Sequence, residues 1–133
     1  MVIANEAPPS RLLINDGRGF FKDETKDRLP KNSFSFWGGA IVDLDHDGHL
    51  DAILGAIQVP GFVPLQARAY LNDGHGRFSD ATAEAMPALT IGRSWSMATG
   101  DLNGDGHDDV VIGGWGTQVR LLMSYTKGKV EVE

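Results

Sequence analysis

Two short acidic runs carry the chemistry that the sequence suggests most directly. Both follow the pattern Asp-x-Asp/Asn-x-Asp-Gly-x-x-Asp. Positions one, three, five, seven and nine are Asp43, Asp45, Asp47, His49 and Asp51 in the first run and Asp101, Asn103, Asp105, His107 and Asp109 in the second. Oxygen-bearing side chains at alternate positions of a tight loop can turn inward together, and the glycine at position six permits the bend. The spacing predicts two sites for a hard cation.

Calcium is the cation that fits these donors best. Ca²⁺ takes about six to eight oxygens, and each loop offers four side chains and the backbone carbonyl of position seven, in His49 or His107. Mg²⁺ demands a tight octahedron and keeps its waters, whereas zinc prefers nitrogen or sulfur ligands. An EF-hand would need a Glu at position twelve, where this chain has Leu54 and Ile112. We expect two Ca²⁺ ions, the second held less tightly because Asn103 replaces a carboxylate.

These metals are expected to be structural rather than catalytic. Neither loop pairs an open coordination position with an obvious base or nucleophile. Outside the loops, the carboxylates that can be placed recur with the repeat described below or lie in turns, as Asp23 and Asp80 do beside Thr25 and Thr82. The sequence therefore predicts a protein that is not an enzyme.

The sequence around the acidic runs repeats. Asn15–Thr25 aligns with Asn72–Thr82 at a spacing of 57 residues, and Asp43–Asp51 aligns with Asp101–Asp109 at a spacing of 58. This period is slightly longer than the roughly 40 to 50 residues of common propeller blades. A repeat of this length predicts an array of similar supersecondary units.

Short strands fill each period, and the 17 glycines favour many tight turns. The predicted strands are Phe36–Val42, Asp51–Ala56, Ala67–Asn72 and Gly76–Thr82 in one unit, and Ser94–Thr99, Asp109–Gly113, Gln118–Met123 and Val130–Glu133 in the next. Asp73-Gly74 is a strong hairpin signal, and no segment shows a sustained helical period. The fold class is therefore all-β, built from β-propeller blades of four antiparallel strands.

The blades are counted from the start of the chain. Val2–Asn5 resembles the second strands that follow the acidic loops, so the predicted single domain over 1–133 divides into a partial blade over 1–29 and full blades over 30–87 and 88–133. That makes about 2.75 blades, whereas closed propellers have about four or more. Either the chain is part of a longer propeller, or copies associate as a homo-oligomer through their open flanks.

Composition excludes several kinds of partner. The formal net charge is −6, and nucleic-acid binding depends on Lys and Arg that neutralise phosphates, so no nucleic-acid partner is expected. No apolar stretch approaches the roughly 18 residues of a membrane span, so no membrane partner is expected. Residues 1–10 lack the basic and apolar segments of a signal peptide. Cysteine is absent, which excludes disulfides and thiolate sites.

A family resemblance follows from these residues. The Asp-x-Asp-x-Asp-Gly-x-x-Asp loop, Trp37-Gly38-Gly39-Ala40 before it and the Asn-Asp-Gly-x-Gly-x-Phe hairpin resemble FG-GAP and VCBS repeats, the integrin-α-like propeller blades. The resemblance implies calcium in loops on one face and an extracellular or cell-surface protein of adhesion or recognition, with a protein or carbohydrate ligand. The alternatives are part of a polysaccharide-acting enzyme, or a self-assembling module that completes a propeller from several copies.

Other side chains are candidates for binding. Trp115 follows a second strand in the glycine-rich stretch 113–116 and is the best candidate for an exposed ligand contact. Trp37 and Trp95 hold one repeated position and are expected to pack between blades. The apolar segment 58–66 is a candidate interaction loop. The four histidines, His46, His49, His75 and His107, are expected to face solvent.

Overall fold

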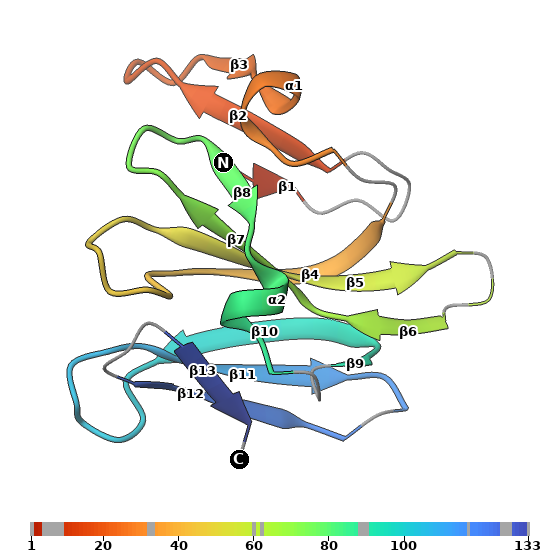
Figure 1. Ribbon diagram of the computed structural model, residues 1–133. Helices are drawn as coiled ribbons and strands as arrows, with labels where there is room; N and C mark the ends of the chain where they lie inside the picture. The colour runs from red at the N-terminus through yellow and green to blue at the C-terminus, as the bar shows by residue number, and fades with distance from the viewer. Residues whose placement is uncertain are drawn as a thin grey trace.

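Three antiparallel β-sheets stack side by side in chain order, with the N-terminal sheet at one end and the C-terminal sheet at the other (Figure 1). This arrangement comes from a computed structural model, which describes residues 2–3, 10–31, 34–59, 61, 63–87, 91–116, 118–125 and 129–132. Two single-turn helices, α1 (Thr25–Arg28) and α2 (Thr82–Ala85), follow strands β3 (Phe21–Asp23) and β8 (Phe78–Asp80).

The first and third sheets are meanders of consecutive strands, and the second sheet has two further strands beside its meander. The first contains β1 (Val2–Ile3), β2 (Arg11–Asn15) and β3 (Phe21–Asp23). The second is built on β4 (Ser35–Val42), β5 (Asp51–Gln58), β7 (Arg68–Asn72) and β8 (Phe78–Asp80), with β6 (Val63–Gln66) and β9 (Ile91–Gly92) beside β5. The third contains β10 (Ser94–Gly100), β11 (Asp109–Gly114), β12 (Arg120–Tyr125) and β13 (Lys129–Val132).

The pairing order confirms the predicted fold class. β4, β5, β7 and β8 pair in sequence, and so do β10, β11, β12 and β13, each antiparallel to the next. β1, β2 and β3 repeat the last three strands of such a unit. The protein is therefore all-β, with two four-stranded propeller-like blades after a three-stranded part of one.

The core lies between neighbouring blades, on both faces of the central one. One cluster joins Val42 and Ile53 of the central blade to Val110, Ile112 and Leu122 of the last blade. A second cluster, on the face toward the first sheet, contains the buried residues Phe36, Ala52, Leu54, Ala56 and Tyr70. Side chains of a strand alternate between the two faces. All of Asp51–Ile57 is buried because both faces of β5 are covered.

The short helices arise from one repeated turn. The Asp23 carboxylate accepts the backbone N–H of Thr25 at 3.0 Å, and the Thr25 hydroxyl accepts the backbone N–H of Leu12 at 2.9 Å. Asp80 and Thr82 make the same pair of bonds, with Ala69 as the strand residue. These aspartates and threonines therefore have the turn role that the sequence predicts. The helical turn that follows was too short to be predicted, because isolated helices of this length are not stable.

The segment 58–66 is not only a loop. β6 pairs with the end of β5 through Ile57 and Pro64, and with β9 of the next repeat through Leu65 and Gly92. The prediction of a loop is therefore wrong for Val63–Gln66, which forms a strand between two blades. A role of the segment in interaction stays a prediction.

Candidate metal centre

Both acidic loops join the first strand of a blade to its second strand. The loop over 43–50 links β4 to β5, and the loop over 101–108 links β10 to β11, so both lie at the same edge of the stacked sheets, at the left of Figure 1. Gly48 and Gly106, at position six, have φ angles of 89° and 86°. A side chain is strained at such angles, so glycine permits the bend that the pattern requires.

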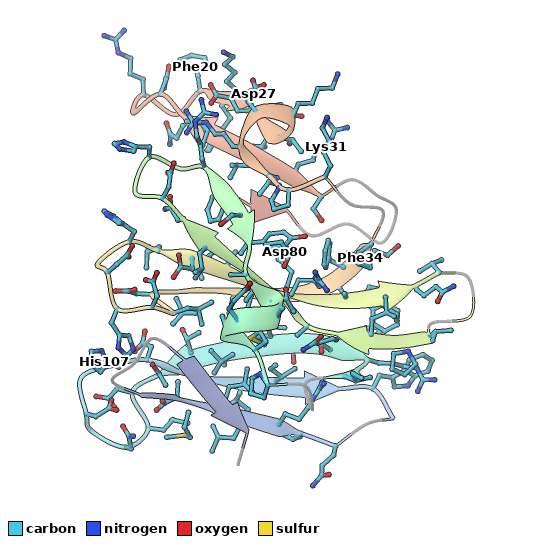
Figure 2. All side chains as sticks on the ribbon, in the orientation of Figure 1. Phe20, Asp27, Lys31, Phe34, Asp80 and His107 are labelled. Atoms are coloured by element: carbon cyan, nitrogen blue, oxygen red, sulfur yellow. The ribbon has the colours of Figure 1, made fainter. Side chains whose placement is uncertain are left out.

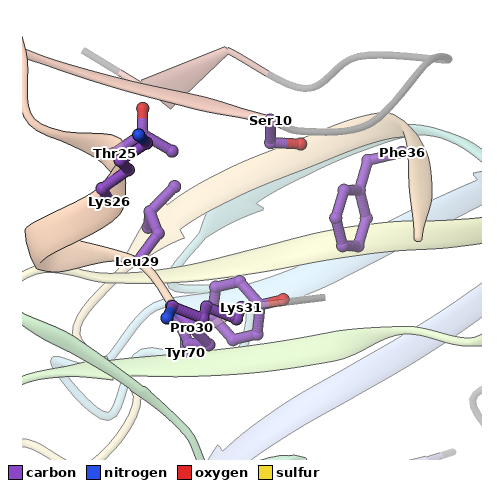
Figure 3. Close-up of a pocket in the computed structure, with 8 residues that line it drawn as sticks. All are labelled: Ser10, Thr25, Lys26, Leu29, Pro30, Lys31, Phe36 and Tyr70. Atoms are coloured by element: carbon purple, nitrogen blue, oxygen red, sulfur yellow. The ribbon is translucent and has the colours of Figure 1, made fainter. Parts of the chain in front are cut away.

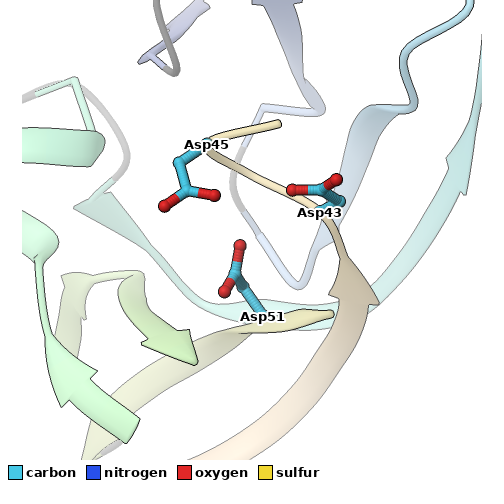
Figure 4. Close-up of side chains that lie close together, drawn as sticks. All are labelled: Asp43, Asp45 and Asp51. Atoms are coloured by element: carbon cyan, nitrogen blue, oxygen red, sulfur yellow. The ribbon is translucent and has the colours of Figure 1, made fainter. Parts of the chain in front are cut away.

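The first loop brings three of its four carboxylates together. Each of Asp43, Asp45 and Asp51 offers an oxygen atom that lies within 4.8 Å of the oxygens of the other two. Figure 4 shows the three carboxylates directed toward a common space. In the part of the chain that the structure describes, no other group of three acidic or histidine side chains is this close. A donor set made only of oxygens suits a hard cation such as Ca²⁺.

Asp51 anchors this centre from the protein interior. Its side chain is 0% exposed, and its two oxygens accept the backbone N–H groups of Leu44 and Asn72, both at 2.8 Å. Burial raises the pKa of Asp51, the charges of Asp45 and Asp47 raise it further, and the two hydrogen bonds oppose the rise. Each carboxylate oxygen keeps a second lone pair for a metal.

Asp45 and Asp43 complete the cluster at the loop surface. Burial raises the pKa of Asp45, and the charges of Asp47 and Asp43 add to the rise. Asp43 accepts the backbone N–H groups of Asp47 and Gly48 at 3.2 and 2.9 Å, which holds the loop closed. Carboxylates this close to one another are stabilised by a divalent cation between them. These residues therefore fit the metal that the spacing predicts.

Asp47 and His49 lie outside the cluster. The exposed Asp47 carboxylate accepts the backbone N–H of His49 at 2.8 Å. The His49 imidazole lies over Gly74 of the neighbouring hairpin, where a side chain at position 74 would meet it. The cluster therefore contains three of the five predicted ligand positions of this loop.

The second loop repeats the hydrogen bonds that anchor the first loop. Asp101 accepts the N–H groups of Gly104, Asp105 and Gly106, and the bond from Gly106 is the main cause of its lowered pKa. Asp109 is buried and accepts the N–H groups of Leu102 and Ser124, both at 2.9 Å.

Asn103 and Asp105, which lie between these two anchors, are exposed. The Asn103 amide donates to Asp105 at 3.3 Å, and Asp105 accepts the N–H of His107 at 2.9 Å. This loop thus repeats the hydrogen bonds of the first, with the amide of Asn103 in place of the carboxylate of Asp45.

His46 and His107 connect the two loops, contrary to the expectation that both face solvent. Their rings stack in parallel, with centroids 3.6 Å apart and planes inclined by 7°. The His46 ring nitrogen also lies 2.5 Å from the Ser124 hydroxyl. Figure 2 shows His107 at the edge where the two blades meet. His49 and His75 are exposed as predicted. The stack was not predicted because it depends on contact between loops of different blades.

Asn72 is a site residue that the metal pattern does not contain. Its backbone N–H reaches Asp51, and its side-chain amide donates to the backbone carbonyl of Leu50 at 3.0 Å. Its side-chain oxygen accepts the N–H groups of Gly74 and Gly76. Asn72 thus joins the acidic loop to the Asp73-Gly74 hairpin. The signal was present in the repeated Asn-Asp-Gly-x-Gly motif, which Asn15 begins in the first sheet.

The tryptophans lie away from the acidic loops, at the opposite ends of the same strands. Trp37 and Trp95 contact each other between blades, as predicted, with ring centroids 4.7 Å apart. Trp115 joins them, with its centroid 6.1 Å from that of Trp37, and is exposed as predicted.

A separate cavity of about 170 Å³ lies between the first sheet and the central blade. Figure 3 shows its lining, which includes Ser10, Leu29, Pro30, Phe36 and Tyr70. Burial raises the pKa of Tyr70 to about 12, so the phenol stays neutral at neutral pH. Among the residues that the structure describes, this lining includes no carboxylate and no histidine.

The fold and the acidic loops define a class of repeat protein. A family model described as an FG-GAP-like repeat matches residues 64–112, which run from β6 through the second acidic loop into β11. The chain therefore carries an FG-GAP-like repeat, which confirms the resemblance seen in the sequence. FG-GAP repeats are structural and ligand-binding modules typical of extracellular proteins. No curated protein matches the chain. No helix in the described residues is long and apolar enough to cross a membrane.

Proposed function

We propose that this chain is a calcium-binding β-propeller repeat module that serves recognition or adhesion outside the cell. The observation that carries the proposal is the cluster of Asp43, Asp45 and Asp51, whose oxygens lie within 4.8 Å of one another in a loop that fixes two strands. Like charges this close are costly without a counter-ion. A bound Ca²⁺ removes that cost and replaces water at the loop.

The calcium would act on the fold. Asp51 already joins its loop to β7 through the N–H of Asn72, so an ion held by Asp51 fixes three strands of the central blade at once. Asp109 reaches Ser124 of β12 in the same way. Metal sites that do not exist in the unfolded chain convert their binding energy into folding energy. Calcium binding should therefore stabilise both blades.

The family favours a location outside the cell. Calcium sites of extracellular modules have dissociation constants of roughly 10⁻⁴ to 10⁻³ M, which suit a calcium-rich exterior. The FG-GAP-like repeat is typical of extracellular proteins. A rigid stack of blades then offers its exposed residues to a partner, which is the basis of a role in recognition or adhesion.

Calorimetric titration of the metal-stripped protein with CaCl₂ tests the proposal. We expect two binding events in the wild type, and one in each of the single variants Asp43→Ala and Asp101→Ala. Asp108→Ala is the matched control, because Asp108 is an exposed acidic neighbour of the second site. A wild type that binds no calcium, or variants that bind as the wild type does, would contradict the proposal.

A further inference from the structure

One residue of the first acidic loop reaches across to the second. His46 directly follows the ligand position Asp45, and its ring stacks on that of His107 at a centroid distance of 3.6 Å. The Nε2 atom of His46 lies 2.5 Å from the hydroxyl oxygen of Ser124, which is buried in β12. Both partners belong to the last blade, whereas His46 belongs to the central blade. The two metal loops are therefore in direct contact through one side chain.

The two partners of His46 support two ligand positions of the second loop. His107 is at position seven, whose backbone carbonyl is an expected calcium ligand. The backbone N–H of Ser124 donates to Asp109, at position nine, with a distance of 2.9 Å. Groups that hold the ligands of a metal in place affect its affinity although they do not touch it. His46 is therefore placed to orient part of the second site.

The repeat is altered where this contact begins. At position four the second loop has Gly104, with a φ angle of 77°, and the first loop has His46, with a φ angle of 61°. In the part of the chain that the structure describes, no other residue except glycine has a positive φ. A residue with a side chain adopts such angles less readily than glycine does. The bend of the loop alone therefore favours glycine at position 46.

The repeat is altered again where the contact ends. Ser124 holds the place of Asn72, because the backbone N–H of each donates to the position-nine aspartate of its blade. The Asn72 side chain makes its hydrogen bonds inside its own blade, with Leu50 and Gly74. The Ser124 hydroxyl instead meets His46 of the neighbouring blade. The contact thus joins two positions at which the last two blades differ.

This contact gives the two sites a physical route of communication. The cluster of Asp43, Asp45 and Asp51 contains residues of the first acidic run only, so the two ions share none of these ligands. An ion in the cluster fixes Asp45 and, with it, the adjacent His46. Calcium in the first loop then favours the arrangement that orients the second loop. Because coupling between two binding sites is reciprocal, calcium in the second loop favours the first site equally.

We propose that His46 is a positioning residue for the second calcium site, and that it makes calcium binding at the two sites positively cooperative. This inference rests on the proposed calcium binding and adds a coupling between the sites. Two cations repel each other, so sites without such a contact would show no coupling or a negative one. The sign of the coupling therefore distinguishes the proposal from electrostatics alone.

Calorimetric calcium titration of metal-stripped protein at constant pH tests the inference, because each site can be measured with the other intact or disabled. Asp43→Ala disables the first site, and we expect the second site then to bind at least about fivefold more weakly than in the wild type. Asp101→Ala should weaken the first site by the same factor. In a His46→Gly background, each affinity should be the same whether the other site is intact or disabled.

Two further variants separate the ring of His46 from its backbone. Asn tolerates the left-handed conformation but lacks the imidazole, so His46→Asn should lose the coupling as His46→Gly does. His75→Ala is the matched control, because His75 is an exposed histidine in a hairpin outside both acidic loops, and it should keep the coupling of the wild type. A purely structural role of His46 would lower the unfolding temperature of its variants and leave the coupling unchanged.

The outcomes distinguish this inference from the proposed function. Two calcium ions that bind independently in the wild type would overturn the inference and leave the proposed function intact. Coupling that persists in His46→Gly would do the same. A wild type that binds no calcium would overturn the proposed function, and this inference with it.

Discussion

Asp51 and Asp109 occupy the same place in successive blades. Each is a buried carboxylate that accepts one N–H from its own acidic loop, of Leu44 or Leu102, and one from the third strand of its blade. The ninth position of the metal pattern is therefore also a structural residue of the blade. It joins loop, second strand and third strand before any cation binds.

Replacement of Asp51 should therefore destabilise the protein even without metal. Asp51→Ala leaves the buried N–H of Leu44 and the partly buried N–H of Asn72 without an acceptor, and a buried group left in this way costs about 1–3 kcal/mol. Relief of repulsion from Asp45 offsets part of this, so we expect a net loss of about 1–3 kcal/mol in the free energy of unfolding. Urea unfolding of metal-stripped protein measures it, with Asp108→Ala as the control. Equal stability of the two variants would contradict the structural role.

The third position of the pattern should set the difference between the two calcium sites. The first loop has Asp45 where the second has Asn103. We expect Asp45→Asn to weaken the tighter site, and Asn103→Asp to strengthen the weaker one, because calcium affinity depends on the number of ligand charges. Calorimetric titration of both single variants and the double variant measures this. The idea fails if the exchange leaves both affinities unchanged.

The pH dependence of stability should reverse in sign when calcium is added. The pKa values of Asp45 and Asp51 are raised, in both first by burial. The folded state therefore holds these protons more tightly than the unfolded chain, whose aspartates titrate near about 3.9. The contribution of this pair to metal-free stability is full below that pH and falls as pH rises toward the raised values.

Calcium requires the ionised carboxylates, so the stability that it adds should grow over the same pH window. Urea unfolding between pH 3.5 and 7 measures both trends. The free energy of unfolding of the wild type minus that of the double variant Asp45→Asn/Asp51→Asn gives the contribution of this pair, because the other titrating groups are the same in both proteins. One of the other titrating groups is Asp23, whose pKa is lowered to about 2, chiefly by its hydrogen bonds from Thr25. If this difference in the free energy of unfolding rose with pH in metal-free protein, the result would contradict the account.

Because the blades are in close contact at Gly55, we predict that a residue with a side chain destabilises the protein at this position. A Cβ atom at Gly55 would lie 2.5 Å from Cβ of Ser94 and 2.6 Å from its carbonyl oxygen, in the neighbouring blade. Backbone cannot give way without a shift of the blade, so Gly55→Ala should cost about 1–3 kcal/mol. Gly100→Ala is the matched control, because a Cβ there has no heavy atom within 4 Å. Thermal unfolding of both variants distinguishes them, and a neutral Gly55→Ala would show that the blades are not packed this closely.

Much of the fold could be predicted because each blade uses local signals. The predicted strand Phe36–Val42 is observed as Ser35–Val42, and Asp51–Ala56 as Asp51–Gln58. Apolar runs between glycine-rich turns and the repeated Asn-Asp-Gly hairpin carried this information. The segment over 63–66 was mistaken for loop because Pro64 weakens its strand signal. It pairs with the end of β5 and with β9 of the next repeat, and the pairing with β9 leaves no periodic signal.

The site could be predicted in part for the same reason. The ligand pattern is local, so it identified Asp43, Asp45 and Asp51, which the structure brings together. The His46–His107 stack and the joining of Trp115 to Trp37 and Trp95 depend on how one blade packs on the next. Contacts of this kind become visible only when the blades are placed in space.

Thermal unfolding of the metal-stripped protein, with and without millimolar calcium, tests the central claim most directly. If both acidic loops hold structural calcium, the midpoint should rise by several degrees or more, since binding to the folded state alone stabilises it. Equal magnesium should give a much smaller rise, and the variant Asp43→Ala/Asp101→Ala should give none. An unchanged midpoint in calcium, or an equal rise in the double variant, would contradict the claim.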